Sequence, residues 1–125
     1  APFSNWTNSE NYTMSLSCHE SAQAILQQSD LFRHWQGPFG AVPVQLLGEL
    51  KQGQYIYFRA RGSKISMQIA SSEAHWQQSE YLATFEEPYF DADSGPLQAG
   101  LCPSDFCASK IVDWVKLYLA NQSAR

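Results

Sequence analysis

The fold is decided by residues 55–70, YIYFRARGSKISMQIA. This stretch contains two runs in which every second residue is apolar, namely Ile56, Phe58 and Ala60, then Ile65, Met67 and Ile69. Alternation of this kind is typical of a strand with one buried face. Between the runs stands Gly62-Ser63, which has glycine first, as a two-residue type II′ turn requires. The stretch therefore predicts a β-hairpin.

The register of this hairpin follows from pairing residues outward from the turn. On one face every pair is apolar: Ala60 with Ile65, Phe58 with Met67, and Ile56 with Ile69. On the other face the pairs are polar: Arg61 with Lys64, Arg59 with Ser66, and Tyr57 with Gln68. A slip of one residue would mix the two faces, so the register is well specified.

The preceding segment, residues 42–50, predicts a third strand. It reaches the hairpin through Lys51-Gln52-Gly53, a three-residue loop with glycine where a left-handed conformation is needed. This loop keeps the core face apolar, with Val44 opposite Ala60, Leu46 opposite Phe58 and Gly48 opposite Ile56. A two-residue loop at Gln52-Gly53 would instead set Glu49 against Ile56. We therefore predict a three-stranded antiparallel meander over residues 42–70.

A helix is predicted before the sheet. Ser17 and Glu20 have the spacing of a capping box, and apolar residues with a helical period follow them. The helix is expected from about Cys18 to His34 and ends before Gly37-Pro38. Residues 1–14 are polar with isolated aromatic side chains, and we expect them to form an irregular N-terminal arm.

A second helix is predicted from Pro103 to about Ala120, with Ser104 or Asp105 as its N-cap. Apolar residues cover most of its circumference, so it is expected to be heavily buried. Residues 72–85 fit either a helix or a fourth strand, because both periods find apolar residues there. Together these elements predict an α+β fold, in which an antiparallel sheet of three to five strands packs against an N-terminal and a C-terminal helix.

The composition limits the classes of function. With 125 residues, the chain is expected to form one domain, residues 1–125. A net charge of −4, with only eight lysines and arginines, argues against nucleic-acid binding. No apolar run approaches the roughly 20 residues of a membrane helix, so we expect a soluble protein without a membrane partner. The histidines and cysteines match no metal-site spacing, and phosphate- and dinucleotide-binding motifs are missing, so neither a metal nor a cofactor is expected.

The chain has three cysteines, Cys18, Cys102 and Cys107. An odd number argues against a complete disulfide framework, and the sequence leaves open whether any of them pair. The count favours a reducing, cytoplasmic compartment over secretion. Two features fit secretion instead. The chain begins with Ala-Pro, which fits removal of a signal peptide as well as trimming of a longer chain, and three triplets match the N-glycosylation pattern. Nothing in the sequence sets the oligomeric state.

The polar face of the meander is the leading candidate site. Its arginines alternate on one strand between tyrosines, which suits bidentate binding of a carboxylate or phosphate while the rings stack on the rest of a ligand. We predict a small binding protein that takes a small anionic ligand or an acidic partner surface on Tyr55, Tyr57, Arg59, Arg61, Gln45, Glu49 and Gln68. Two other readings are that the face is merely solvated, or that the acidic loop Glu86–Asp93 folds over it and pairs with the arginines.

Two further hypotheses belong to other classes of protein. An acidic interaction protein, in the manner of a toxin-immunity protein, would neutralise a basic partner through the segment 80–93, with Glu80, Glu86, Glu87, Asp91 and Asp93. A small enzyme would use Cys107 in the first turn of the second helix, where the helix dipole favours a thiolate, together with His19, His34 or His75. No catalytic motif supports the enzyme, so a binding protein is the expectation.

Overall fold

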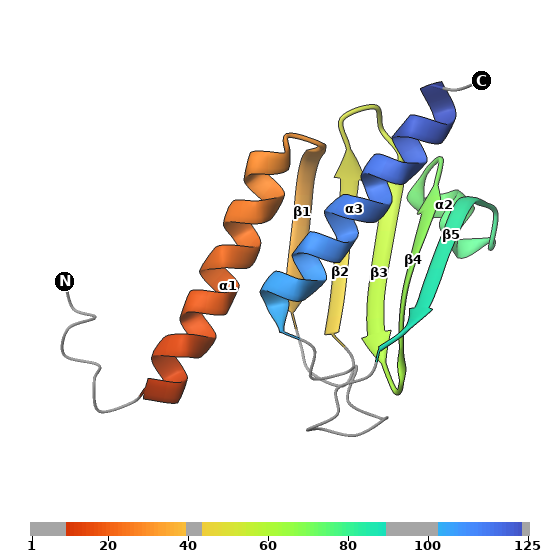
Figure 1. Cartoon of the computed structure of the whole chain (residues 1–125). Coiled ribbons are helices and arrows are strands. Elements are labelled where there is room, and N and C mark those ends of the chain that lie inside the picture. The colour runs from red at the N-terminus through yellow and green to blue at the C-terminus, as the bar shows by residue number, and fades with distance from the viewer. Residues whose placement is uncertain (1–9, 40–43, 90–102, 124–125) are drawn as a thin grey trace.

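The computed structural model describes residues 10–39, 44–89 and 103–123. They form an α+β fold in which a five-stranded antiparallel sheet carries two long helices on one face (Figure 1). The predicted fold class is therefore confirmed. Along the chain the elements are α1 (Glu10–Ser29), β1 (Phe32–Phe39), β2 (Val44–Leu50), β3 (Tyr55–Arg61), β4 (Lys64–Ala70), α2 (Glu73–Gln77), β5 (Tyr81–Pro88) and α3 (Ser104–Ser123).

The meander has the predicted register. The strands lie in the order β1-β2-β3-β4-β5, and each is antiparallel to its neighbour. Across the hairpin, Ala60 pairs with Ile65 and Phe58 pairs with Met67. On the other side of β3, Val44 of β2 pairs with the same Ala60. The period of two therefore assigned each side chain of these strands to the correct face.

Both predicted turns are confirmed by the backbone. Gly62 has a φ of +66° while φ at Ser63 is not positive, which is the pattern of a type II′ turn. In the loop between β2 and β3, Gly53 has a φ of +100°. The amide of Leu50 donates to the carbonyl of Gln54 at 2.8 Å, so these two residues close a three-residue loop.

The first helix differs from the prediction at both ends. It does not continue to His34, because α1 ends at Ser29 and β1 begins at Phe32. Asp30 adopts a left-handed φ of 59°, which turns the chain out of the helix. Phe32 is buried opposite Leu50, so it contributes to the core from a strand and not from the helical stripe. At the other end α1 begins at Glu10, so residues 10–14 are helical and not an irregular arm, while residues 1–9 lie outside the described part.

Gln23 fastens α1 to β1. Its side-chain oxygen accepts a hydrogen bond from the indole Nε1 of Trp35 at 2.9 Å, and its Nε2 donates to the carbonyl of Gly37 at 2.8 Å. The pairing of β1 with β2 is shifted on both sides of Trp35, and Gly37 has a φ of +104°. Such bulges are common in the edge strands of sheets. The side-chain bridge therefore holds an irregular edge strand in place.

The ambiguous segment, residues 72–85, contains both kinds of structure. α2 is a short helix whose N-cap, Ser72, accepts a hydrogen bond from the amide of His75 at 3.1 Å. β5 then joins the sheet as its fifth strand, with Ala83 opposite Ile69 and Phe85 opposite Met67. The strand reading of this segment thus holds from Tyr81 onward.

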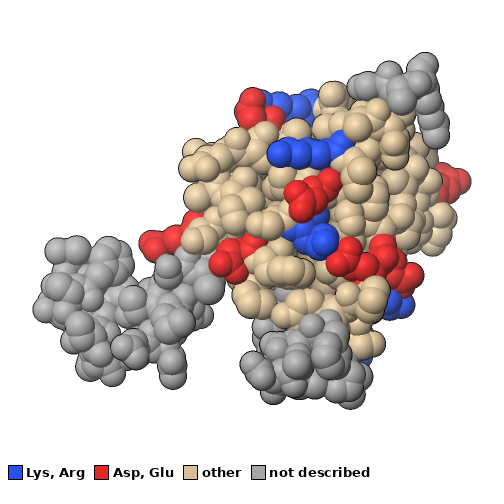
Figure 2. Space-filling model, viewed as in Figure 1, with Lys and Arg blue, Asp and Glu red and all other residues tan. Residues whose placement is uncertain are grey.

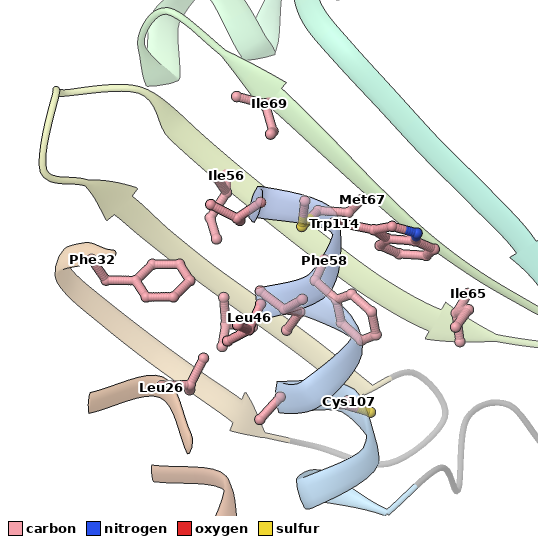
Figure 3. Close-up of a cluster of buried hydrophobic side chains, with 14 of the residues drawn as sticks. Leu26, Phe32, Leu46, Ile56, Phe58, Ile65, Met67, Ile69, Cys107 and Trp114 are labelled. Atoms are coloured by element: carbon pink, nitrogen blue, oxygen red, sulfur yellow. The ribbon is translucent and has the colours of Figure 1, made fainter. Parts of the chain in front are cut away.

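The core lies between the sheet and the two long helices (Figure 3). α1 packs mainly against α3, and both contribute to one apolar cluster with the sheet. Phe58 of β3 is fully buried, and Trp114 of α3 stacks on Phe85 of β5 with ring centroids 5.5 Å apart. The largest fully buried side chains of this core are those of Leu26, Leu46, Leu50, Ile56, Phe58, Ile65, Met67, Ile69, Ile111, Val115 and Cys107.

The C-terminal helix is buried as predicted, with one correction at its start. The amide of Cys107 donates to the carbonyl of Pro103 at 3.0 Å, so Pro103 occupies the N-cap position in place of Ser104 or Asp105.

The side of the molecule that carries α1 and α3 is largely uncharged, with acidic and basic side chains interspersed (Figure 2). Among the described helices, none combines the length and apolar character needed to span a membrane.

Candidate functional site

The open face is the side of the sheet opposite α1 and α3. The observed register places Tyr55, Tyr57, Arg59 and Arg61 of β3 on this face, as the sequence predicted. Gln45 and Glu49 come from β2, and Gln68 comes from β4. All seven predicted site residues therefore share one face, because side chains alternate along a strand and each of these residues is next to a core position.

An aromatic cluster divides the open face. Trp76 of α2 lies against two tyrosines of β3, with ring centroids 5.6 Å from Tyr55 and 4.8 Å from Tyr57. Its indole Nε1 donates to Oε1 of Gln68 at 2.8 Å, and Nε2 of Gln45 donates to the hydroxyl of Tyr57 at 3.1 Å. α2 therefore lies on the face away from α3, in agreement with its position behind β4 and β5 in Figure 1.

Two hollows lie on the open face. The cationic hollow has a volume of about 580 Å³ and is lined by Arg59, Arg61, Gly62, Ser63, Lys64, Ser66, Gln68, Thr84 and Glu86. The acidic hollow has a volume of about 390 Å³ and is lined by His34, Gln36, Leu47, Gly48, Glu49, Gly53, Tyr55, Ser72 and Glu73. The predicted site is thus divided: Arg59, Arg61 and Gln68 line one hollow, and Glu49 and Tyr55 line the other.

The arginines of the cationic hollow have no acidic partner among the described residues. Other basic side chains of the sheet do pair: Arg33 with Glu49, and Lys64 with Glu86. The Nε of Arg59 is also shielded from solvent and finds no hydrogen-bond acceptor in the described part of the chain. A guanidinium N–H in that position is costly unless an acceptor is supplied.

The acidic segment does not reach these arginines in its described part. Glu86 pairs with Lys64, and Glu87, on the opposite face of β5, pairs with Lys110 of α3 at 3.1 Å. Glu80 lies 3.8 Å from a ring nitrogen of His75. Asp91 and Asp93 lie outside the described residues. In this segment Glu86 and Glu87 therefore pair with lysines, Glu80 lies beside a histidine, and none of the three pairs with Arg59 or Arg61.

The acidic hollow has a different chemistry. Oε1 of Glu49 accepts from Arg33 at 3.1 Å and lies 3.3 Å from Nε2 of His34. The hydroxyl of Tyr55 is shielded from solvent and has no hydrogen-bond partner among the described residues. Burial raises the pKa of Tyr55, and the nearby Glu73 carboxylate and Tyr57 raise it further. This hollow therefore holds two carboxylates, of which that of Glu49 contacts Arg33, beside a phenol whose pKa is raised.

Of the three histidines predicted as catalytic partners, His19 lies on α1 with an exposed side chain, and His34 and His75 lie on the side of the sheet opposite Cys107. The side chain of Cys107 is completely buried in the core, on the helix side of the sheet (Figure 3). His34 lines a hollow of the open face, and His75 belongs to α2 on that same side. A nucleophile needs contact with its substrate, which a fully buried thiol lacks. The side chains of Cys18 and Cys102 lie outside the described part of the structure. Among the described residues, no group of three or more potential metal ligands is found.

Sequence reasoning missed the contribution of α2 and β5 to this face. Trp76 and Thr84 belong to residues 72–85, whose sequence fits either a helix or a strand, and Glu86 belongs to the predicted acidic loop, whereas the structure extends β5 to Pro88. The available signal was the polar alternation at positions 84 and 86, which matches the open-face residues of β4.

Comparison of the chain with protein-family models, with curated proteins and with solved structures finds no match.

Proposed function

We propose that this protein is a small binding protein that takes an anionic ligand into the cationic hollow. The observation that carries the proposal is the pair of arginines, Arg59 and Arg61, which line one hollow and have no acidic partner among the described residues. A volume of about 580 Å³ lies within the range of small-molecule sites. Arginine is the side chain best suited to bidentate contact with a carboxylate or phosphate.

The shielded Nε of Arg59 favours a binding site over a merely solvated surface. A solvated arginine has water available at every nitrogen, whereas the Nε of Arg59 is shielded and lacks an acceptor in the described chain. An unsatisfied buried donor typically costs about 1–3 kcal/mol. An anion bound to the guanidinium would remove that cost, so binding energy is available at this position.

The aromatic cluster borders the cationic hollow through Gln68, although Tyr57 and Trp76 are not among the residues that line it. Trp76 rests on Tyr57 and is joined by a hydrogen bond to Gln68, which lines the cationic hollow. Aromatic rings next to a guanidinium pair suit a ligand with a charged group and an organic part. The acidic partner surface predicted from the sequence would use the same arginines, but a hollow of this size favours a small ligand.

The immunity-like alternative gains less support. Two of its three described glutamates are engaged by lysines: Glu86 by Lys64 and Glu87 by Lys110. A surface that steers a basic partner needs unpaired negative charge.

A thermal-shift screen of small carboxylates and phosphates tests the proposal. A ligand present at 100 times its dissociation constant stabilises a protein by about 2.7 kcal/mol. We expect Arg59→Gln and Arg61→Gln each to abolish or reduce that shift. Lys116→Gln is the matched control, because it removes one positive charge from α3 on the other side of the sheet. A shift that persists in both arginine variants, or that is lost equally in the control, contradicts the proposal.

A further inference from the structure

Hydrogen-bond donors predominate among the side chains that line the cationic hollow. Arg59, Arg61 and Lys64 carry only donors in their charged groups, and the hydroxyls of Ser63, Ser66 and Thr84 can also donate. The acceptor-only group in the lining is the carboxylate of Glu86, which pairs with Lys64. A ligand that accepts many hydrogen bonds and donates none is the best match for such a lining.

Trp76 adds one more donor by fixing the amide of Gln68. The indole N–H can only donate, so the atom it contacts at 2.8 Å must be the amide oxygen of Gln68. The NH₂ group of Gln68 is then left as the unused end of a side chain that lines the hollow. A helix on the edge of the open face thus determines which end of this amide a ligand meets.

The charge of the hollow selects among anions. Three cationic side chains and one carboxylate give its lining a formal charge of +2. A phosphomonoester carries about −1.5 to −2 near pH 7 and has three terminal oxygens, all strong acceptors. A carboxylate has one charge and two oxygens, and a sulfate ester has three oxygens but only one charge. The phosphomonoester therefore matches the hollow in both charge and number of acceptors.

We infer that the ligand of the cationic hollow is a small-molecule phosphomonoester, held by Arg59, Arg61 and Lys64. This inference rests on the proposed function, because it names the chemical class of the anion that the hollow takes. Glu86 limits the charge to the value that a dianion neutralises, and it holds Lys64 at the rim of the site.

Titration of the ¹⁵N-labelled protein at pH 7.5, followed by NMR chemical shifts, tests the inference with three probes of similar size: phenyl phosphate, phenyl sulfate and benzoate. Phenyl phosphate is expected to shift the amides of β3 and β4 around the Gly62-Ser63 turn and to bind about tenfold more tightly than either monoanion. Equal dissociation constants, with shifts still confined to the hollow, would overturn the phosphomonoester assignment and leave the anion-binding function standing. If none of the probes shifts these amides, both proposals fail.

A pair of neighbouring variants provides an independent readout. Glu86→Gln removes the carboxylate of the hollow and should tighten phenyl phosphate binding several-fold. Glu87→Gln makes the same chemical change one residue along β5, where the side chain contacts Lys110 on the helix side, and should leave binding unchanged. Equal affinities of the two variants would overturn the charge argument.

A last comparison separates a small ligand from a phosphorylated protein. Free O-phosphoserine and a short peptide containing phosphoserine should bind with similar affinity, because the hollow holds only the phosphoryl group. Binding of the peptide at least tenfold more tightly would overturn the assignment to a small molecule.

Discussion

Two glycines with nearly the same positive φ allow a sharp test of the packing of β1 against β2. Gly37 in β1 has a φ of +104°, and Gly53 in the β2–β3 loop has a φ of +100°. A Cβ atom added to Gly37 would lie 2.6 Å from the carbonyl oxygen of Gln45 in β2, whereas a Cβ atom added to Gly53 would have no neighbour within 4 Å. Gly37→Ala and Gly53→Ala therefore share the backbone strain and differ in the steric contact.

The expected losses of stability follow from these two terms. Placing alanine at such a φ costs about 1–3 kcal/mol, offset by about 0.4–1 kcal/mol from the reduced entropy of the unfolded chain. We expect Gly53→Ala to lower the free energy of unfolding by about 1–2 kcal/mol. Gly37→Ala must also move one strand away from its neighbour, which adds roughly 2 kcal/mol by comparison with overpacked cores. For a domain of this size, the difference corresponds to a melting temperature about 8 °C lower for Gly37→Ala.

Urea denaturation followed by circular dichroism measures both free energies, and thermal melts check their order. The difference between the two variants is the decisive quantity, because the strain common to both cancels. If Gly37→Ala proved as stable as Gly53→Ala, then β1 would not lie against β2 as described, and the position of the Gln23 bridge would also be in doubt.

Three further predictions concern side chains that join the elements. Gln23→Leu loses both hydrogen bonds that link α1 to β1, and urea denaturation should show a loss of about 2 kcal/mol; an unchanged midpoint would contradict the bridge. The folded state raises the pKa of Tyr55, so the wild type should lose stability as pH rises through and above about 10. Tyr55→Phe should therefore have the same melting temperature as the wild type at pH 7, and its melting temperature should fall less between pH 9 and 11. Trp76→Phe keeps the ring but frees the Gln68 amide, so the dissociation constant of phenyl phosphate measured by NMR should rise roughly threefold or more; unchanged affinity would remove Gln68 from the site.

The candidate site was predictable only in part. The alternation of side chains along β3 predicted that Tyr57 and Arg59 lie on one face of the sheet, and the structure agrees. The division of that face into two hollows was not predictable, because it depends on Trp76, which reaches Tyr57 from a helix outside the meander. The ion pairs of the site could not be predicted from the sequence either. Which of two adjacent glutamates faces the arginines depends on the register of β5, and that register sends Glu87 to Lys110 instead.

The sequence by itself determined the meander. An alternation of period two and two glycine-containing turns are local features: a slip of one residue would bury arginine and expose isoleucine, and the turns fix the remaining choice of register, so local information was sufficient there. Only the tertiary structure decided the elements on either side. Phe32 reaches the core equally well from a helix or from an edge strand, so its burial could not reveal where α1 ends. The tertiary structure also decided that Arg59 and Arg61 lie beside each other in one hollow without a described acidic partner, because ion pairing depends on contacts between strands and helices that are distant in the chain.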